Sequence, residues 1–145
     1  MKTRALTLLT LMAAGRAMTL AFIHRAGDGG PGDPPDAWLM PLLGDAAIGL
    51  TAIAIAWLVW NHRTPVVWLA AMIWNALAIF DALAAFVVET TVPWPEFFML
   101  EIFGRSMFVL AIALHLVVAA LLVDRETRAE FGIDLDAPDL TRTTS

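Results

Sequence analysis

Four long apolar stretches dominate this sequence, and ionisable side chains lie well inside them. The stretches cover residues 5–23, 38–60, 66–88 and 97–123. A helix needs roughly 20 apolar residues to cross the hydrocarbon layer of a bilayer, and the stretches reach or approach this length. The ionisable residues inside them are Arg16, Asp45, Asp81, Glu101 and Arg105. Because charge is costly in hydrocarbon, we expect these side chains to be paired or to serve a function.

The composition points to a membrane protein. Hydrophobic residues make up 59% of the 145 residues and the mean hydropathy is +0.73, which leaves too little polarity for the surface of a soluble domain. Helices satisfy their own backbone in lipid, and the alternation of a membrane barrel strand is absent. The sequence therefore predicts an all-α membrane protein, an antiparallel bundle of four transmembrane helices in one domain (1–123), followed by a disordered cytoplasmic tail (124–145).

The distribution of basic residues predicts the orientation. Lys2, Arg4, Arg63, Arg125 and Arg128 flank the segments so that both termini and the second loop carry positive charge. By the positive-inside rule, this side faces the cytoplasm. The first loop is rich in Gly, Pro and Asp, and the third carries acidic residues only. Arginine outnumbers lysine eight to one, which is typical of a GC-rich bacterial genome, so we expect a multi-pass protein of the bacterial inner membrane.

Tryptophans lie near the ends of the predicted spans. Trp38 and Trp94 fall at the outer boundary, and Trp57, Trp60 and Trp68 fall at the inner one. Tryptophan is enriched at both membrane–water interfaces, so this placement predicts an aromatic belt on each side.

An alternative reading concerns the first apolar stretch. A basic start, a Leu/Thr/Ala run and small residues at 13–17 are also features of a signal peptide. Arg16 beside the cleavage site is unusual for such a peptide, and the apolar pattern resumes at 18–23. Cleavage would leave three spans in the same orientation.

The ionisable residues fall at similar depths when helical rise is converted to distance. Arg16 lies about 11 Å below the outer end of its segment, Asp45 and Asp81 roughly 10 Å, and Arg105 roughly 12 Å. Glu101 lies about 6 Å deep by the same measure. The sequence therefore predicts a charged layer in the outer half of the bilayer.

Spacing assigns some of these residues to helix faces. Glu101 and Arg105 are one turn apart, so they can pair on a face that continues through Phe108, Ile112 and His115 into the bundle. Asn75 and Asp81 are six residues apart and lie on different faces, so they cannot share a partner. Asn75 and His115 are secondary candidates for the polar layer.

Several kinds of chemistry are disfavoured. The chain has no cysteine, and no HExxH motif occurs. His24 and His115 are too far apart in depth to share a haem or a metal, and His62 could approach His115 only if the fourth segment reaches its inner end near the turn that holds His62. Ser106 has no histidine within helical reach, and the Gly-rich first loop lacks a phosphate-binding context. The basic residues form no stripe for nucleic acid. We expect no cofactor and no bound metal.

Three functions remain open. The first is a non-enzymatic structural or accessory membrane protein, in which the charged layer holds the helices together. The second is a small carrier or proton-coupled binding protein, with Asp45 and Asp81 as proton or cation ligands and Arg16 and Arg105 as countercharges or anion ligands. The third, ranked last, is a membrane enzyme acting on lipid or quinone, with Glu101, Asp81 and His115 as its only acid–base groups. Expected partners are the lipid bilayer and a second copy or a larger membrane complex.

Overall fold

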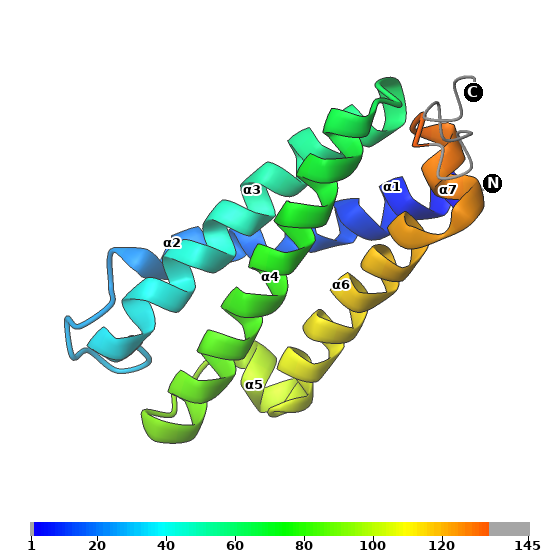
Figure 1. Ribbon diagram of the computed structural model, residues 1–145. Coiled ribbons are helices and arrows are strands. Elements are labelled where there is room, and N and C mark those ends of the chain that lie inside the picture. The colour runs from blue at the N-terminus through cyan, green and yellow to red at the C-terminus, as the bar shows by residue number, and fades with distance from the viewer. Residues whose placement is uncertain (1, 134–145) are drawn as a thin grey trace, which may run out of the picture.

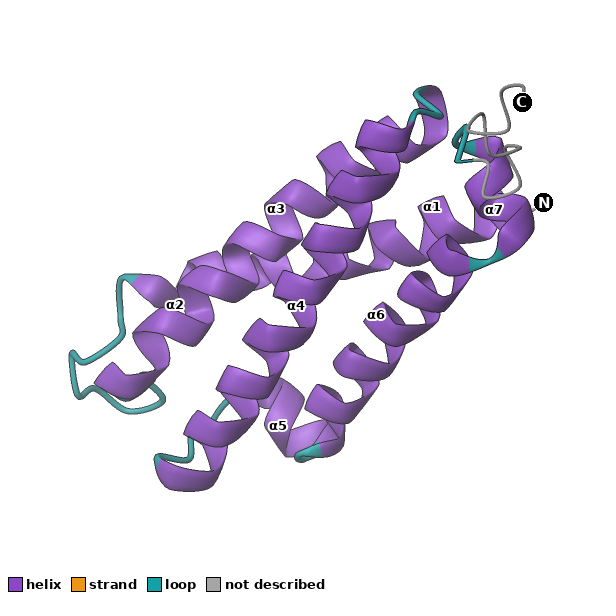
Figure 2. Ribbon diagram, viewed as in Figure 1, coloured by secondary structure: helices purple, strands orange, loops and turns teal. Residues whose placement is uncertain are grey.

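The computed structural model describes residues 2–133, and every regular element within them is helical (Figure 2). The first apolar stretch contains α1 (Lys2–Met12), the 3-10 helix η1 (Ala13–Thr19) and α2 (Leu20–Ile23). The chain continues through η2 (Asp36–Trp38), α3 (Leu39–Asn61), α4 (Pro65–Thr91), α5 (Phe98–Phe103), α6 (Ser106–Val123) and α7 (Arg125–Glu130).

Four of the helical segments are long and apolar enough to cross a membrane, judged by length and composition. They are Lys2–Ile23, Asp36–Asn61, Pro65–Thr91 and Ser106–Val123. The prediction of four apolar, membrane-length helices is thereby confirmed. Pro65 occupies the first turn of α4, and the Thr64 hydroxyl accepts a hydrogen bond from the Val67 amide at 3.4 Å, so α4 begins with both a proline and a side-chain cap.

The fourth predicted span, 97–123, is not one continuous helix. Gly104 lies between α5 and α6 with φ +54°, a backbone region that favours glycine. Its amide donates to the Leu100 carbonyl at 2.8 Å and closes the last turn of α5. The prediction of a single helix over 97–123 is therefore wrong, because this glycine ends α5 and only Ser106–Val123 is left as a long helix.

The long helices contact one another in a closed ring (Figure 1). Helix α3 packs against α1 and η1 on one side and α4 on another, while α6 packs against α4 and α1. The contact between α3 and η1 is close because Gly49 has no side chain. A Cβ atom there would lie 2.1 Å from the backbone nitrogen of Ala17. This close approach brings residue 16 against α3.

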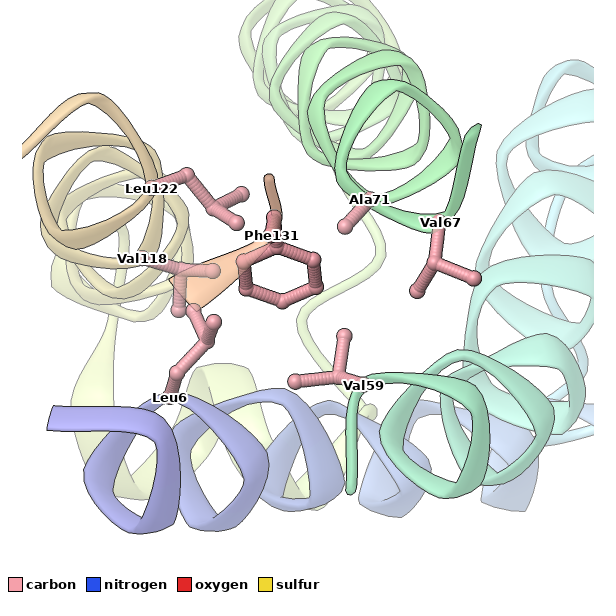
Figure 3. Packing of buried hydrophobic residues seen from close by; sticks show 7 residues of the cluster. All are labelled: Leu6, Val59, Val67, Ala71, Val118, Leu122 and Phe131. Carbon is pink, nitrogen blue, oxygen red and sulfur yellow. The ribbon is translucent and has the colours of Figure 1, made fainter. Parts of the chain in front are cut away.

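A cluster of buried apolar side chains lies at the end of the molecule that holds α7 and the N-terminus (here the α7 end). The ring of Phe131 is fully buried and points between side chains of four helices (Figure 3). Those side chains are Leu6, Val59, Val67, Ala71, Val118 and Leu122. Phe131 thus ties the segment that follows the last long helix to the core.

The segment after residue 123 is partly helical, although the sequence predicted a disordered tail. The Asp124 carboxylate accepts from the amides of Glu126 and Thr127 at 3.1 and 3.3 Å and caps the start of α7. At the other end, Gly132 has φ +73° and the Ile133 amide donates to the Arg128 carbonyl at 3.0 Å, a Schellman-type ending. Residues 134–145 of the predicted tail lie outside the described residues.

The α7 end also carries ion pairs. Lys2 Nζ lies 2.8 Å from Asp124 Oδ2 and 2.9 Å from Glu126 Oε2. The Lys2 ammonium, together with the amide hydrogen bonds, lowers the pKa of Asp124 below its ordinary value. Arg63, in the turn between α3 and α4, lies 3.5 Å from Glu130. The N-terminus, this turn and α7 are therefore neighbours.

The opposite end (the α5 end) is covered by an aromatic cluster. Trp94 stacks on Phe97 with ring centroids 4.8 Å apart, and meets Phe22 and Trp38 edge-on at 5.2 and 5.6 Å. Trp38 and Trp94 are buried, with their indole N–H groups donating to the carbonyls of Val92 (2.8 Å) and Gly32 (3.3 Å).

The predicted outer aromatic belt is therefore wrong for Trp38 and Trp94. Their rings are taken up by tertiary packing, and backbone acceptors replace water for the indole groups. At the α7 end, Trp57 and Trp60 are 57% and 52% exposed, as interfacial anchors would be.

Candidate functional site

The centre of the candidate site is a guanidinium held between two carboxylates. Arg16 projects from η1, and its Nε donates to Asp45 Oδ1 on α3 at 2.6 Å. Its Nη2 lies 2.5 Å from Asp81 Oδ2 on α4 and also pairs with Asp45. One arginine thus joins three segments that are far apart in the sequence. Charge-assisted pairs of this kind are the strongest hydrogen bonds that protein side chains make.

Local sequence explains how these three side chains meet. The contact between Gly49 and Ala17 brings η1 against α3, four residues along from Asp45. Gly44, beside Asp45, faces α4. A Cβ atom at Gly44 would lie 1.8 Å from Asp81 Oδ1, so the missing side chain makes room for that carboxylate.

The network extends to α6 through His115. Arg16 Nη1 lies 3.4 Å from His115 Nε2 and 3.4 Å from the Ala78 carbonyl. His115 Nδ1 lies 2.9 Å from Asn75 Oδ1, and Asn75 Nδ2 donates to the Ala71 carbonyl at 2.8 Å. The amide of Asn75 is thereby oriented with its oxygen toward the imidazole, so Nδ1 is the donor and Nε2 is left to accept from Arg16. The network therefore joins η1, α3, α4 and α6.

Burial and charge define what this cluster can do. The side chains of Arg16, Asp45 and Asp81 are 14%, 22% and 16% exposed, so water screens them only in part. Two carboxylates face one guanidinium, which leaves one formal negative charge when all three are ionised. A proton or a cation would balance that charge.

The structure brings together five of the seven residues singled out from the sequence. Arg16, Asp45 and Asp81 form the cluster, and Asn75 and His115 extend it. Asn75 and Asp81 do contact different partners, as their spacing predicted.

Glu101 and Arg105 lie apart from this cluster, at exposed positions near the α5 end. Neither side chain has a hydrogen bond or ion pair with any residue in 2–133, so the predicted pair between them is not formed there. The break at Gly104 is the reason, since it removes the common helix face on which the two would have met. The lower part of that face behaves as predicted, with Phe108 and His115 buried.

An open groove between α3 and α4 was not predicted from the sequence. The groove has a volume of about 490 Å³ and is lined chiefly by apolar side chains. The lining includes Met40, Leu43, Gly44, Phe80, Asp81 and Ala84. Asp81 is the one ionisable residue of the lining, so the cluster and the groove meet at this carboxylate. Among the lining residues, Gly44 is the one whose residue type indicates a close approach. That approach is to Asp81 on α4, so it cannot be recognised from the sequence of α3 alone.

In comparisons with known proteins, no protein-family model, no curated protein and no solved structure matches the chain. Among residues 2–133, no group of three or more His, Asp or Glu side chains is arranged to hold a metal ion.

Proposed function

We propose that this chain is an integral protein of the bacterial cytoplasmic membrane with a structural or accessory role. In this proposal the four apolar segments form an antiparallel transmembrane bundle, and Arg16 with its two carboxylates fixes their packing. The observation that carries it is the Arg16 network, whose members come from all four segments. Polar groups in a bilayer interior are stabilised by finding one another, as these do.

The outward-facing side chains support a lipid environment. Large apolar residues are exposed along the long helices, with Val66, Met40 and Phe80 at 76%, 73% and 72%. Soluble monomers rarely expose contiguous apolar surface on this scale. The buried charges and exposed apolar groups together are the arrangement that a bilayer favours.

The ion pairs at the α7 end support cytoplasmic termini. Lys2 contacts α7, and Arg63 contacts Glu130, so the basic flanks of three segments gather at one end. The positive-inside rule then assigns the α7 end to the cytoplasm and the loop 24–35 to the outer side.

Membrane fractionation and cysteine labelling test this proposal. The chain has no cysteine, so Asp28→Cys in the outer loop and Ala129→Cys on α7 each introduce one reporter. Both positions are exposed, which makes them a matched pair. We expect the protein in the carbonate-resistant membrane fraction, with a membrane-impermeant maleimide labelling Asp28→Cys in spheroplasts and Ala129→Cys only after lysis. Extraction by carbonate or the reverse labelling pattern would contradict the proposal.

A second candidate function is a small carrier or proton-coupled binding protein. The unbalanced carboxylate of the cluster and its position beside the groove favour it over an enzyme. Proteoliposomes that carry a pH-sensitive dye would report proton flux. Flux that Asp81→Asn abolishes in a folded protein would support this function, and its absence in the wild type would leave the structural role.

A further inference from the structure

The groove between α3 and α4 combines an apolar lining with a single carboxylate. Met40 and Phe80 are strongly exposed at its mouth, at 73% and 72%, and Gly44 and Asp81 lie deeper. Its volume of about 490 Å³ falls within the range of sites for small organic ligands. Such sites have mostly apolar walls and a small number of polar groups that fix the orientation of the ligand.

The two oxygens of the Asp81 carboxylate have different surroundings. Oδ2 is the atom that pairs with Arg16, whereas Oδ1 lies against Gly44 in the groove lining. Within residues 2–133, the Arg16 guanidinium bonds to Asp81 through Oδ2, and the Asp45 carboxyl group also lies within hydrogen-bond reach of the Asp81 carboxyl group. A ligand with a charged N–H group could therefore reach this oxygen while Asp81 keeps its arginine.

Charge decides which ligand the groove would select. When all three side chains are ionised, the cluster carries one negative charge in excess, so a monovalent cation neutralises it, whereas an anion would add a second uncompensated charge to a poorly hydrated site. We propose that the groove binds a lipophilic amine, whose ammonium donates to Asp81 Oδ1 and whose apolar part packs between Leu43, Phe80 and Ala84. This proposal rests on the proposed membrane location, because the mouth of the groove then opens to the bilayer.

A fluorescent amine and its neutral counterpart test the proposal on the full-length protein in a non-ionic detergent. Dansylcadaverine carries a primary ammonium on a pentyl chain, and N-dansylpentylamine is the same molecule without it. We expect dansylcadaverine to bind at least ten times more tightly than the neutral probe, and Asp81→Asn to remove this preference. Equal binding of the two probes by the wild type, or an unchanged preference in Asp81→Asn, would overturn the proposal.

A second variant keeps the test decisive if Asp81→Asn does not fold. Ala84→Phe fills the groove from an exposed position and keeps every charge of the cluster, and Ala76→Phe is its control at an exposed position of the same helix outside the groove lining. We expect Ala84→Phe to weaken dansylcadaverine binding at least tenfold and Ala76→Phe to leave it unchanged. Equal effects of the two, or a wild-type dimer that excludes the probe and that Ala84→Phe dissociates, would contradict the amine site. Carbonate extraction and helical content of the wild type are measured separately, so failure of the membrane assignment is told apart from failure of the site.

Discussion

Replacing the central arginine is the perturbation whose effect the structure defines most closely. Arg16→Gln removes the one cation that contacts Asp45 and Asp81 within residues 2–133 and leaves two carboxylates facing each other at low exposure. Removing one partner of a buried ion pair costs about 3–5 kcal/mol, because the other charge is left uncompensated. We therefore expect Arg16→Gln to lower the free energy of unfolding by about 3–5 kcal/mol.

The charge balance predicts a strong asymmetry between the partners. Asp45→Asn leaves Arg16 and Asp81 as a neutral pair, so its cost should be about 1 kcal/mol, the size of an ordinary hydrogen bond. The triple variant Arg16→Gln/Asp45→Asn/Asp81→Asn removes every charge of the cluster and should recover most of the loss, since a buried ion pair is often matched by neutral groups.

Unfolding in mixed micelles of a non-ionic detergent and dodecyl sulfate, followed by far-ultraviolet circular dichroism, measures these differences. If Arg16→Gln and Asp45→Asn cost the same, or if the triple variant is as unstable as Arg16→Gln, then charge compensation is not what holds the cluster together.

Three further predictions concern packing and the α7 end. Gly49→Ala should lower the free energy of unfolding by about 1–3 kcal/mol, because the new Cβ atom would meet the Ala17 backbone. Gly15→Ala is the control and should not destabilise the protein, because a Cβ atom there meets nothing within 4 Å. Equal unfolding curves of the two variants would refute this. Phe131→Ala should lower the free energy of unfolding by about 3–5 kcal/mol in the same assay. Phe103→Ala, at a side chain that is 46% exposed, should lower it much less. Equal effects of the two would mean that the Phe131 ring contributes nothing to the core. The lowered pKa of Asp124 contributes stability that is present above its ordinary pKa and is lost as pH falls through the folded value. Asp124→Asn keeps a capping side chain, so it should flatten the acid limb of a plot of melting temperature against pH. An unchanged acid limb would refute the pairing of Asp124 with Lys2.

The four apolar helices could be predicted because the physics that produces them is local. Long apolar runs interrupted by Gly, Pro and charged residues identify both the segments and their breaks, and Pro65 marks the start of α4. The break at Gly104 could not be predicted, because one glycine inside an apolar run breaks a helix only where the backbone takes up a positive φ, which depends on tertiary packing. The burial of Trp94 could not be predicted for a similar reason, since the sequence does not show whether its ring packs against lipid or against Phe97.

The cluster was predicted in part because depth follows from counting residues. Arg16, Asp45 and Asp81 meet at a common level, as helical rise suggested. The direction in which each side chain points depends on helix rotation and on close approaches such as that of Gly49 to Ala17, which no single segment encodes. The groove beside Asp81 exists only between two helices, so it could not be seen in either one.

Solid-state NMR of the protein in lipid bilayers tests the central claim most directly. With ¹⁵N in the arginine side chains and ¹³C in the aspartate carboxyl groups, dipolar recoupling measures whether the Arg16 guanidinium lies within about 4 Å of carboxyl carbons, as charge-assisted hydrogen bonds require. The account predicts couplings to two aspartates, one of which disappears in Asp45→Asn and the other in Asp81→Asn. An Arg16 guanidinium without a carboxyl carbon at that distance, in a protein that is folded in the bilayer, would contradict it.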